Sequence, residues 1–120
     1  MKKIRELPLL LLPSRLLAFL WRRSADLMWG LCYGILVDRA GSGSRIARYV
    51  RVDRPKNLVL GKNSTINKSV EISSEISSSK IKIGDDVTIN SFVKIDYTGG
   101  IVIGDGSFIS ENSILYTHDH

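Results

Sequence analysis

A short phrase recurs three times in the second half of this chain of 120 residues, at positions 58–66, 81–89 and 101–109. Its aliphatic side chains stay in register, and each copy places one more aliphatic residue six positions further on. The six-spaced positions are Leu60, Ile66, Ile72, Ile83, Ile89, Ile95, Ile103, Ile109 and Leu115. A fixed period of this kind indicates units that cannot bury their apolar faces alone and that stack on their neighbours.

The six-residue spacing fits neither a continuous strand nor a helix, because strand side chains alternate every two residues and helix faces return every 3.6. It is typical of short strands joined by turns, in which one residue on each side points to a common axis and three sides make a coil of about eighteen residues. Leu60, Ile83 and Ile103 start coils that are 23 and 20 residues apart, which predicts insertions of five and two residues after Ile72 and Ile95. The sequence therefore predicts a mainly β fold, a triangular parallel solenoid over residues 45–120.

Small and polar residues are expected at the corners of this solenoid. Gly61 and Gly84 each follow an inward aliphatic residue, where a turn leaves little room for a Cβ atom. Asn67 and Asn90 are expected to accept left-handed backbone geometry at the turns.

The first part of the chain differs in charge from the second. Residues 1–56 hold 12 Lys and Arg against 4 acidic residues, whereas residues 57–120 hold 5 against 8, for a formal net charge of +5. The positive charges are interleaved with Leu runs rather than with the aromatic and polar side chains that contact bases. This pattern argues against nucleic acid as a partner. The single cysteine, Cys32, excludes an internal disulfide, is consistent with a reducing compartment, and is interpreted as a small core residue.

Residues 1–44 are predicted to be a basic amphipathic helical leader. The apolar pattern from Pro13 to Val37 indicates two helices that meet near Ser24, and Ala40–Ser44 is interpreted as a linker. Such helices suit the interface of an anionic membrane, and they equally suit packing on the β-domain or on a partner subunit. The prolines, Arg15 and the short apolar run argue against a cleaved signal peptide and against a membrane span.

Residues 58–120 closely resemble the hexapeptide-repeat acyltransferases, in particular the maltose and galactoside O-acetyltransferases and their relatives that acetylate capsule, O-antigen and exopolysaccharide sugars. The six-spaced aliphatic residues carry the resemblance, together with the Leu-rich leader, residues 54–58 and residues 61–63. The resemblance implies a left-handed parallel β-helix, acetyl-CoA as the acyl donor, a sugar or polysaccharide acceptor and a homotrimer. It also implies a cytoplasmic location, with the leader as a peripheral contact to the inner face of the membrane.

Both histidines of the chain, His118 and His120, lie at its end on either side of Asp119. Histidine can accept a hydroxyl proton near neutral pH and then deliver a proton to the leaving group. The resemblance implies that one of them is the catalytic base; a gap-free count from Ile103 favours His120, and the Thr-His-Asp pattern favours His118. Asp119 is a candidate to orient an imidazole, and Asn90 is a candidate to hold the acceptor or the oxyanion, with a plain turn residue as its alternative.

A metal site is the competing interpretation of the two histidines, as in the γ-type carbonic anhydrases that share this fold. A catalytic zinc needs three protein ligands, and the chain offers no third histidine, so we expect no metal. The acidic residues Asp85, Asp86, Asp96 and Asp105 recur at turn positions and are interpreted as a solvated corner ladder.

The chain ends at His120, where the resembled enzymes carry further coils that build much of the acetyl-CoA groove. We therefore expect a C-terminally truncated form of an O-acetyltransferase. The alternative is a catalytically inactive, membrane-associated β-helix fragment or interaction module.

Overall fold

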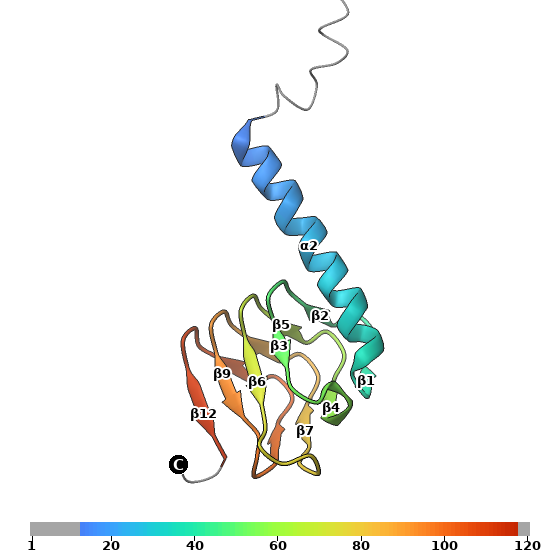
Figure 1. Cartoon of the computed structure of the whole chain (residues 1–120), viewed down its shortest axis with the longest axis vertical. Helices are drawn as coiled ribbons and strands as arrows, with labels where there is room; N and C mark the ends of the chain where they lie inside the picture. The colour runs from blue at the N-terminus through green and yellow to red at the C-terminus, as the bar shows by residue number, and fades with distance from the viewer. Residues whose placement is uncertain (1–12, 118–120) are drawn as a thin grey trace, which may run out of the picture.

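The computed structural model describes residues 13–117, which form one α-helix followed by a parallel β-helix of four coils (Figure 1). The helix is α2 (Ser14–Leu36). Each coil contributes one strand to each of three parallel four-stranded sheets, in the orders β1-β4-β7-β10, β11-β8-β5-β2 and β12-β9-β6-β3. The predicted mainly β, solenoidal fold is therefore confirmed.

The strands are two or three residues long, as expected for the sides of a small triangle. Coil 1 holds β1 (Arg39–Ala40), β2 (Arg45–Ile46) and β3 (Arg51–Val52), followed by the 3-10 turn η1 (Pro55–Asn57). Coil 2 holds β4 (Leu58–Leu60), β5 (Thr65–Ile66) and β6 (Glu71–Ser73). Coil 3 holds β7 (Ile81–Ile83), β8 (Thr88–Ile89) and β9 (Lys94–Asp96), and coil 4 holds β10 (Ile101–Ile103), β11 (Phe108–Ile109) and β12 (Ile114–Tyr116).

The six-spaced aliphatic residues stack in the register that the repeat predicts. On the second side of the triangle, Ile89 pairs with Ile66 in the coil before it and with Ile109 in the coil after it. The other two sides stack in the same way, with the columns Leu60, Ile83, Ile103 and Ile72, Ile95, Leu115. The inner side chains of coils 2 and 3 are almost completely buried, so the core runs along the solenoid axis.

The turns place a left-handed residue at the same position of every coil. At the first corner these residues are Gly43, Asn63, Asp86 and Gly106, and at the second they are Tyr49, Ser69, Phe92 and Asn112. The prediction that Asn67 and Asn90 take this geometry is wrong. Each directly follows an inward isoleucine at the end of a strand, and its side-chain amide makes hydrogen bonds along the stack instead.

Close contact between coils explains the glycine column at the first corner. A Cβ atom at Gly61 would overlap the backbone carbonyl of Gly84 in the next coil, and a Cβ atom at Gly84 would overlap Asp105. A Cβ atom at Gly104, in coil 4, would meet nothing within 4 Å. The need for glycine therefore comes from the neighbouring coil rather than from the turn itself.

The leader forms one continuous helix in the described residues, so the prediction of two helices is wrong. Ser24 and Asp26 lie inside α2, and the Asp26 carboxylate binds Arg48 of coil 1 instead of capping a second helix. Ala25 is buried, and the Trp29 indole donates a hydrogen bond of 3.0 Å to the Val50 carbonyl. The second half of α2 therefore covers the open end of coil 1, while the first half projects beyond it (Figure 1).

Two smaller expectations about the leader also change. The segment Ala40–Ser44 is not a linker, because β1 already pairs with β4 and the segment turns the first corner of coil 1. Cys32 is exposed rather than part of the core, since the helix contacts the solenoid through Trp29 and Tyr33 on a different side. The predicted insertions follow β6 and β9, as residues 74–80 and 97–100.

Candidate functional site

The described chain ends at a polar corner of the solenoid, where the third side meets the first. Thr117 is the residue that precedes His118 in the sequence. Its hydroxyl donates a hydrogen bond of 2.8 Å to the Asp96 carbonyl and accepts one of 2.8 Å from the Gly99 amide. Thr117, the last described residue, is thereby held against coil 3 at this third corner.

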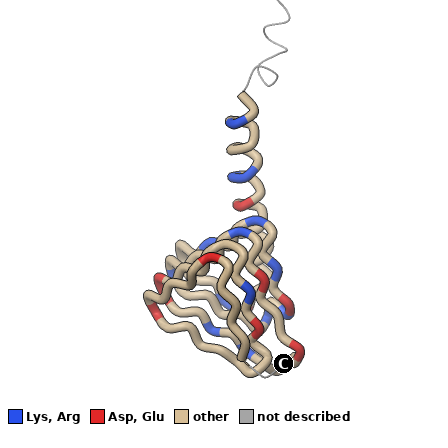
Figure 2. Tube along the Cα trace, turned by 90° about the vertical axis from the view of Figure 1, so that its left-hand side faces the viewer, with Lys and Arg blue, Asp and Glu red and all other residues tan. Residues whose placement is uncertain are grey.

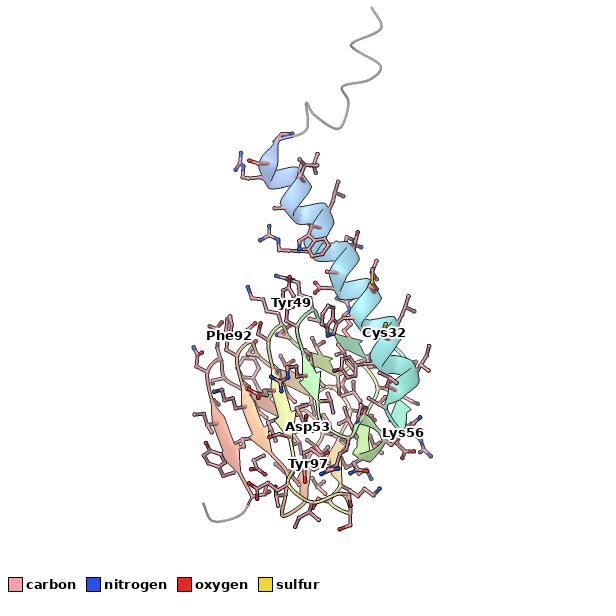
Figure 3. All side chains as sticks on the ribbon, in the orientation of Figure 1. Cys32, Tyr49, Asp53, Lys56, Phe92 and Tyr97 are labelled. Carbon is pink, nitrogen blue, oxygen red and sulfur yellow. The ribbon has the colours of Figure 1, made fainter. Side chains whose placement is uncertain are left out.

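Tyr97 lies at the centre of the third corner and is completely buried. Its hydroxyl donates a hydrogen bond of 2.6 Å to the backbone carbonyl of Asp53 in coil 1 (Figure 3). Burial raises the pKa of the Tyr97 phenol above its usual value near 10, and a hydrogen bond from Asn57 and the charge of Arg54 partly oppose this rise. Tyr97 therefore stays protonated and acts as a fixed donor inside the corner.

The insertion at residues 74–80 closes over this corner through hydrogen bonds. The Asn57 side-chain amide donates to the Ser77 carbonyl at 2.9 Å, and its oxygen accepts from the Lys80 ammonium at 3.2 Å. Ser79 donates to the Thr98 carbonyl, and the Thr98 hydroxyl accepts from the Glu75 amide at 2.9 Å. The insertion is thus an ordered wall of the corner.

Asp96 brings a buried carboxylate to the same corner. Its side chain accepts a hydrogen bond of 2.9 Å from the Thr98 amide, and only about 9% of the residue is exposed. Asp96 does not belong to the ladder of Asp85 and Asp105, which lies at the first corner. There, Asp105 accepts from the Asp85 amide at 2.7 Å and Asp85 accepts from the Lys62 amide at 2.8 Å.

The ladder interpretation is therefore right for Asp85 and Asp105 and wrong for Asp96, which the register places on β9 at another corner. Asp85 and Asp105 each satisfy a backbone N–H of the preceding coil, which is a structural role. Within residues 13–117, no group of three side chains is placed to hold a metal ion.

Asn90 lies at the second corner, one side of the triangle away from the third corner. Its side-chain oxygen accepts a hydrogen bond of 3.1 Å from Asn67, and its side-chain nitrogen donates at 3.2 Å to the Ile109 carbonyl. Both ends of the amide are therefore used within the stack. Asn90 and Thr117 do not meet within one chain, since they leave different sides of different coils.

A pocket of about 530 Å³ lies between α2 and the first two coils. Its lining includes Arg23, Leu27 and Leu31 from α2 and Arg45, Thr65 and Asn67 from the solenoid. The pocket depends on how the helix docks on coil 1, so the repeat pattern alone gave no sign of it. Asn67 connects the pocket wall to Asn90 through their hydrogen bond.

Three of the predicted site residues, His118, Asp119 and His120, lie outside the described residues. Sequence reasoning missed Tyr97 and Thr117. Both residues belong to the third corner, and Thr117 directly precedes His118 in the sequence. The signal for Tyr97 is a large aromatic residue in a turn otherwise made of Thr and Gly. Comparisons of the chain with protein-family models, with curated proteins and with solved structures find no match.

Proposed function

We propose that this chain acts as an acetyl-CoA-dependent O-acetyltransferase whose acceptor is a sugar or a cell-surface polysaccharide. The observation that supports the proposal is a four-coil parallel β-helix in which Thr117, the residue before His118 in the sequence, is fixed at the third corner. No metal takes part in the proposed reaction.

In the proposed reaction, His118 or His120 accepts the proton of an acceptor hydroxyl while the hydroxyl oxygen attacks the thioester carbonyl carbon of acetyl-CoA. The tetrahedral intermediate then loses the CoA thiolate as the C–S bond breaks, and the protonated imidazole returns its proton to the sulfur. Asp119 orients the imidazole. Asn90 contributes an amide to the acceptor or to the oxyanion.

The proposed active unit is a homotrimer with its sites between subunits. Asn90 and the residue before His118 lie at different corners of one solenoid, so a site that uses both is completed more simply by two neighbouring copies. Exposed apolar residues on coil 4, such as Val102, Phe108 and Ile114, provide surface for such a contact. The proposed location is cytoplasmic.

The test is an acetyl-transfer assay with purified chain, acetyl-CoA and a panel of sugar and polysaccharide acceptors, which follows release of the free CoA thiol. We expect His118→Ala or His120→Ala to abolish transfer and Asn112→Ala, an exposed corner residue of coil 4, to leave it unchanged. Unchanged transfer in both single histidine variants and in the double variant would refute the histidine mechanism.

The alternative function, an inactive β-helix module that binds a partner, is favoured by one observation. The pocket of about 530 Å³ is built from α2 and coils 1 and 2, whereas the third corner at Thr117 belongs to coils 3 and 4. Calorimetry with acetyl-CoA distinguishes the two functions. The enzyme should release or absorb heat as it binds acetyl-CoA, whereas the inactive module should show no binding.

A further inference from the structure

The outer side of α2 is a continuous apolar surface that the solenoid leaves uncovered. Its side chains are exposed over 39% to 77% of their area. They are Leu16, Leu17, Leu20, Trp21, Leu27, Met28, Leu31 and Ile35. We call these residues the outer face of α2. An exposed apolar surface of this size marks a contact site for another protein or for a membrane.

The outer face points away from the coils except at Leu27 and Leu31, which also line the pocket between α2 and coils 1 and 2. The docked side consists of Ala25, Trp29 and Tyr33, which recur every four residues and contact coil 1. Ile35 follows two residues after Tyr33, which places it about 200° further around the helix, and it is 77% exposed. In Figure 1 the solenoid lies on one side of α2, so a flat surface can approach the helix from the other side.

Positive charge is concentrated in α2 and coil 1, and the charge falls from coil 1 to coil 4. Residues 13–57 carry nine Lys and Arg against three acidic residues, whereas residues 81–117 carry two against five. The outward positions of coil 1 are Arg39, Arg45 and Arg51, and the same positions of coil 4 are Val102, Phe108 and Ile114. Figure 2 shows basic residues along α2 and in the coils beside it.

From these observations we infer that α2 binds the surface of an anionic lipid bilayer, with its outer face among the acyl chains and coil 1 next to the headgroups. Lipid matches both properties of this end of the molecule, because its interior takes Leu and Trp side chains and its anionic headgroups attract Arg. Coil 4, which is acidic, then lies about three strand spacings of 4.8 Å further from the membrane.

A second copy of the chain fits the same surface less well. Pairing two outer faces would bring the strongly basic ends of two chains together, and their like charges would repel each other. Within the described residues, no helix has the combination of length and apolar character that crossing a membrane requires. The inferred contact runs along α2 at the bilayer surface, and it does not depend on the proposed acetyl transfer.

The first experiment is flotation of the full chain with vesicles of phosphatidylcholine alone or with one third phosphatidylglycerol. We expect binding to the anionic vesicles, weakened by high salt, and at least tenfold weaker binding of the double variant Met28→Glu and Ile35→Glu, which changes two exposed outer-face residues outside the pocket. The matched control is Ile76→Glu with Phe92→Glu, which adds the same charge to exposed apolar residues of coils 2 and 3 and should bind as the natural chain does. Equal binding of the α2 variant and the natural chain overturns the inference.

A second measurement needs no change to Met28 or Ile35 and so remains decisive if the double variant fails to fold. The chain has two tryptophans; Trp21 lies on the outer face and Trp29 on the docked side. Brominated acyl chains should quench the emission of the natural chain, and Trp21→Phe should remove this quenching. Equal quenching in Trp21→Phe overturns the inference, as does light scattering that shows an oligomer held by the outer face together with an absence of vesicle binding.

Discussion

The hydroxyl of Tyr97 in coil 3 donates a hydrogen bond of 2.6 Å to the backbone carbonyl of Asp53 in coil 1, so that one side chain spans the coil between them. The strand ladders connect each coil only to its direct neighbours. Tyr97 adds a contact of longer range, since its partner lies 44 residues earlier in the chain. The third corner is therefore the place where a single side chain couples three coils.

Replacement of Tyr97 by Phe should lower the free energy of unfolding by about 1 to 2 kcal/mol, because the Asp53 carbonyl loses its buried donor while the ring stays in place. Urea unfolding followed by circular dichroism measures this change. Tyr49→Phe is the matched control, since Tyr49 is half exposed and keeps its ring contact with Trp29 at 5.4 Å. Equal losses in the two variants would contradict the proposed role of the hydrogen bond.

The raised pKa of Tyr97 makes stability depend on pH at the alkaline end. Burial, the main cause, disfavours the phenolate in the folded chain, so the unfolded chain loses this proton first as the pH rises. The stabilising contribution is fully present below pH ~10 and is lost as the pH rises further. The difference in unfolding free energy between the natural chain and Tyr97→Phe should therefore shrink above that pH; a difference that is constant with pH would contradict the prediction.

The glycine column gives a prediction with its control inside the same motif. Gly61→Ala should destabilise the solenoid by about 1 to 3 kcal/mol, because the new methyl group would overlap the Gly84 carbonyl and push two coils apart. Gly104→Ala makes the same change where nothing lies within 4 Å, so its effect should stay within about 0.5 kcal/mol. Thermal unfolding of the two variants compares them directly, and similar shifts would refute the role given to coil contact.

The stacking of Ile66, Ile89 and Ile109 could be predicted because it depends on local geometry alone. Once every sixth residue faces inward, parallel coils can place it only above its equivalent in the previous coil. The left-handed positions of the second corner were predicted two residues too early, at Asn67 and Asn90 instead of Ser69 and Phe92. Asparagine can adopt left-handed backbone geometry, but here the side-chain amides of both residues make hydrogen bonds between coils.

The third corner and the docking of α2 could not be predicted, because both depend on contacts outside the repeat. Tyr97 lies in an inserted segment whose length follows from the spacing but whose path does not. The contact of Asp26 with Arg48 joins a helix to a coil across 22 residues that have no period. Asn90 is at the end of β8, as the repeat implies, whereas the roles of His118, Asp119 and His120 remain predictions.

The contact that fixes α2 on the solenoid gives the last prediction. The Asp26 carboxylate accepts hydrogen bonds from the Arg48 backbone amide at 2.8 Å and from its guanidinium at 3.1 and 3.2 Å, and the Arg48 side chain is only 13% exposed. Asp26→Asn should therefore lower the unfolding free energy by about 1 kcal/mol.

The matched control is Glu71→Gln, which removes the carboxylate from the ion pair between Glu71 and Arg51. Arg51 and Glu71 are 3.8 Å apart, with side chains 72% and 41% exposed, so water screens their attraction. The loss should stay below about 0.5 kcal/mol. Because α2 reaches coil 1 through Asp26 and not through Glu71, only Asp26→Asn should also increase amide hydrogen exchange along the second half of α2. Equal exchange in both variants would mean that Trp29 and Tyr33 hold the helix without this ion pair.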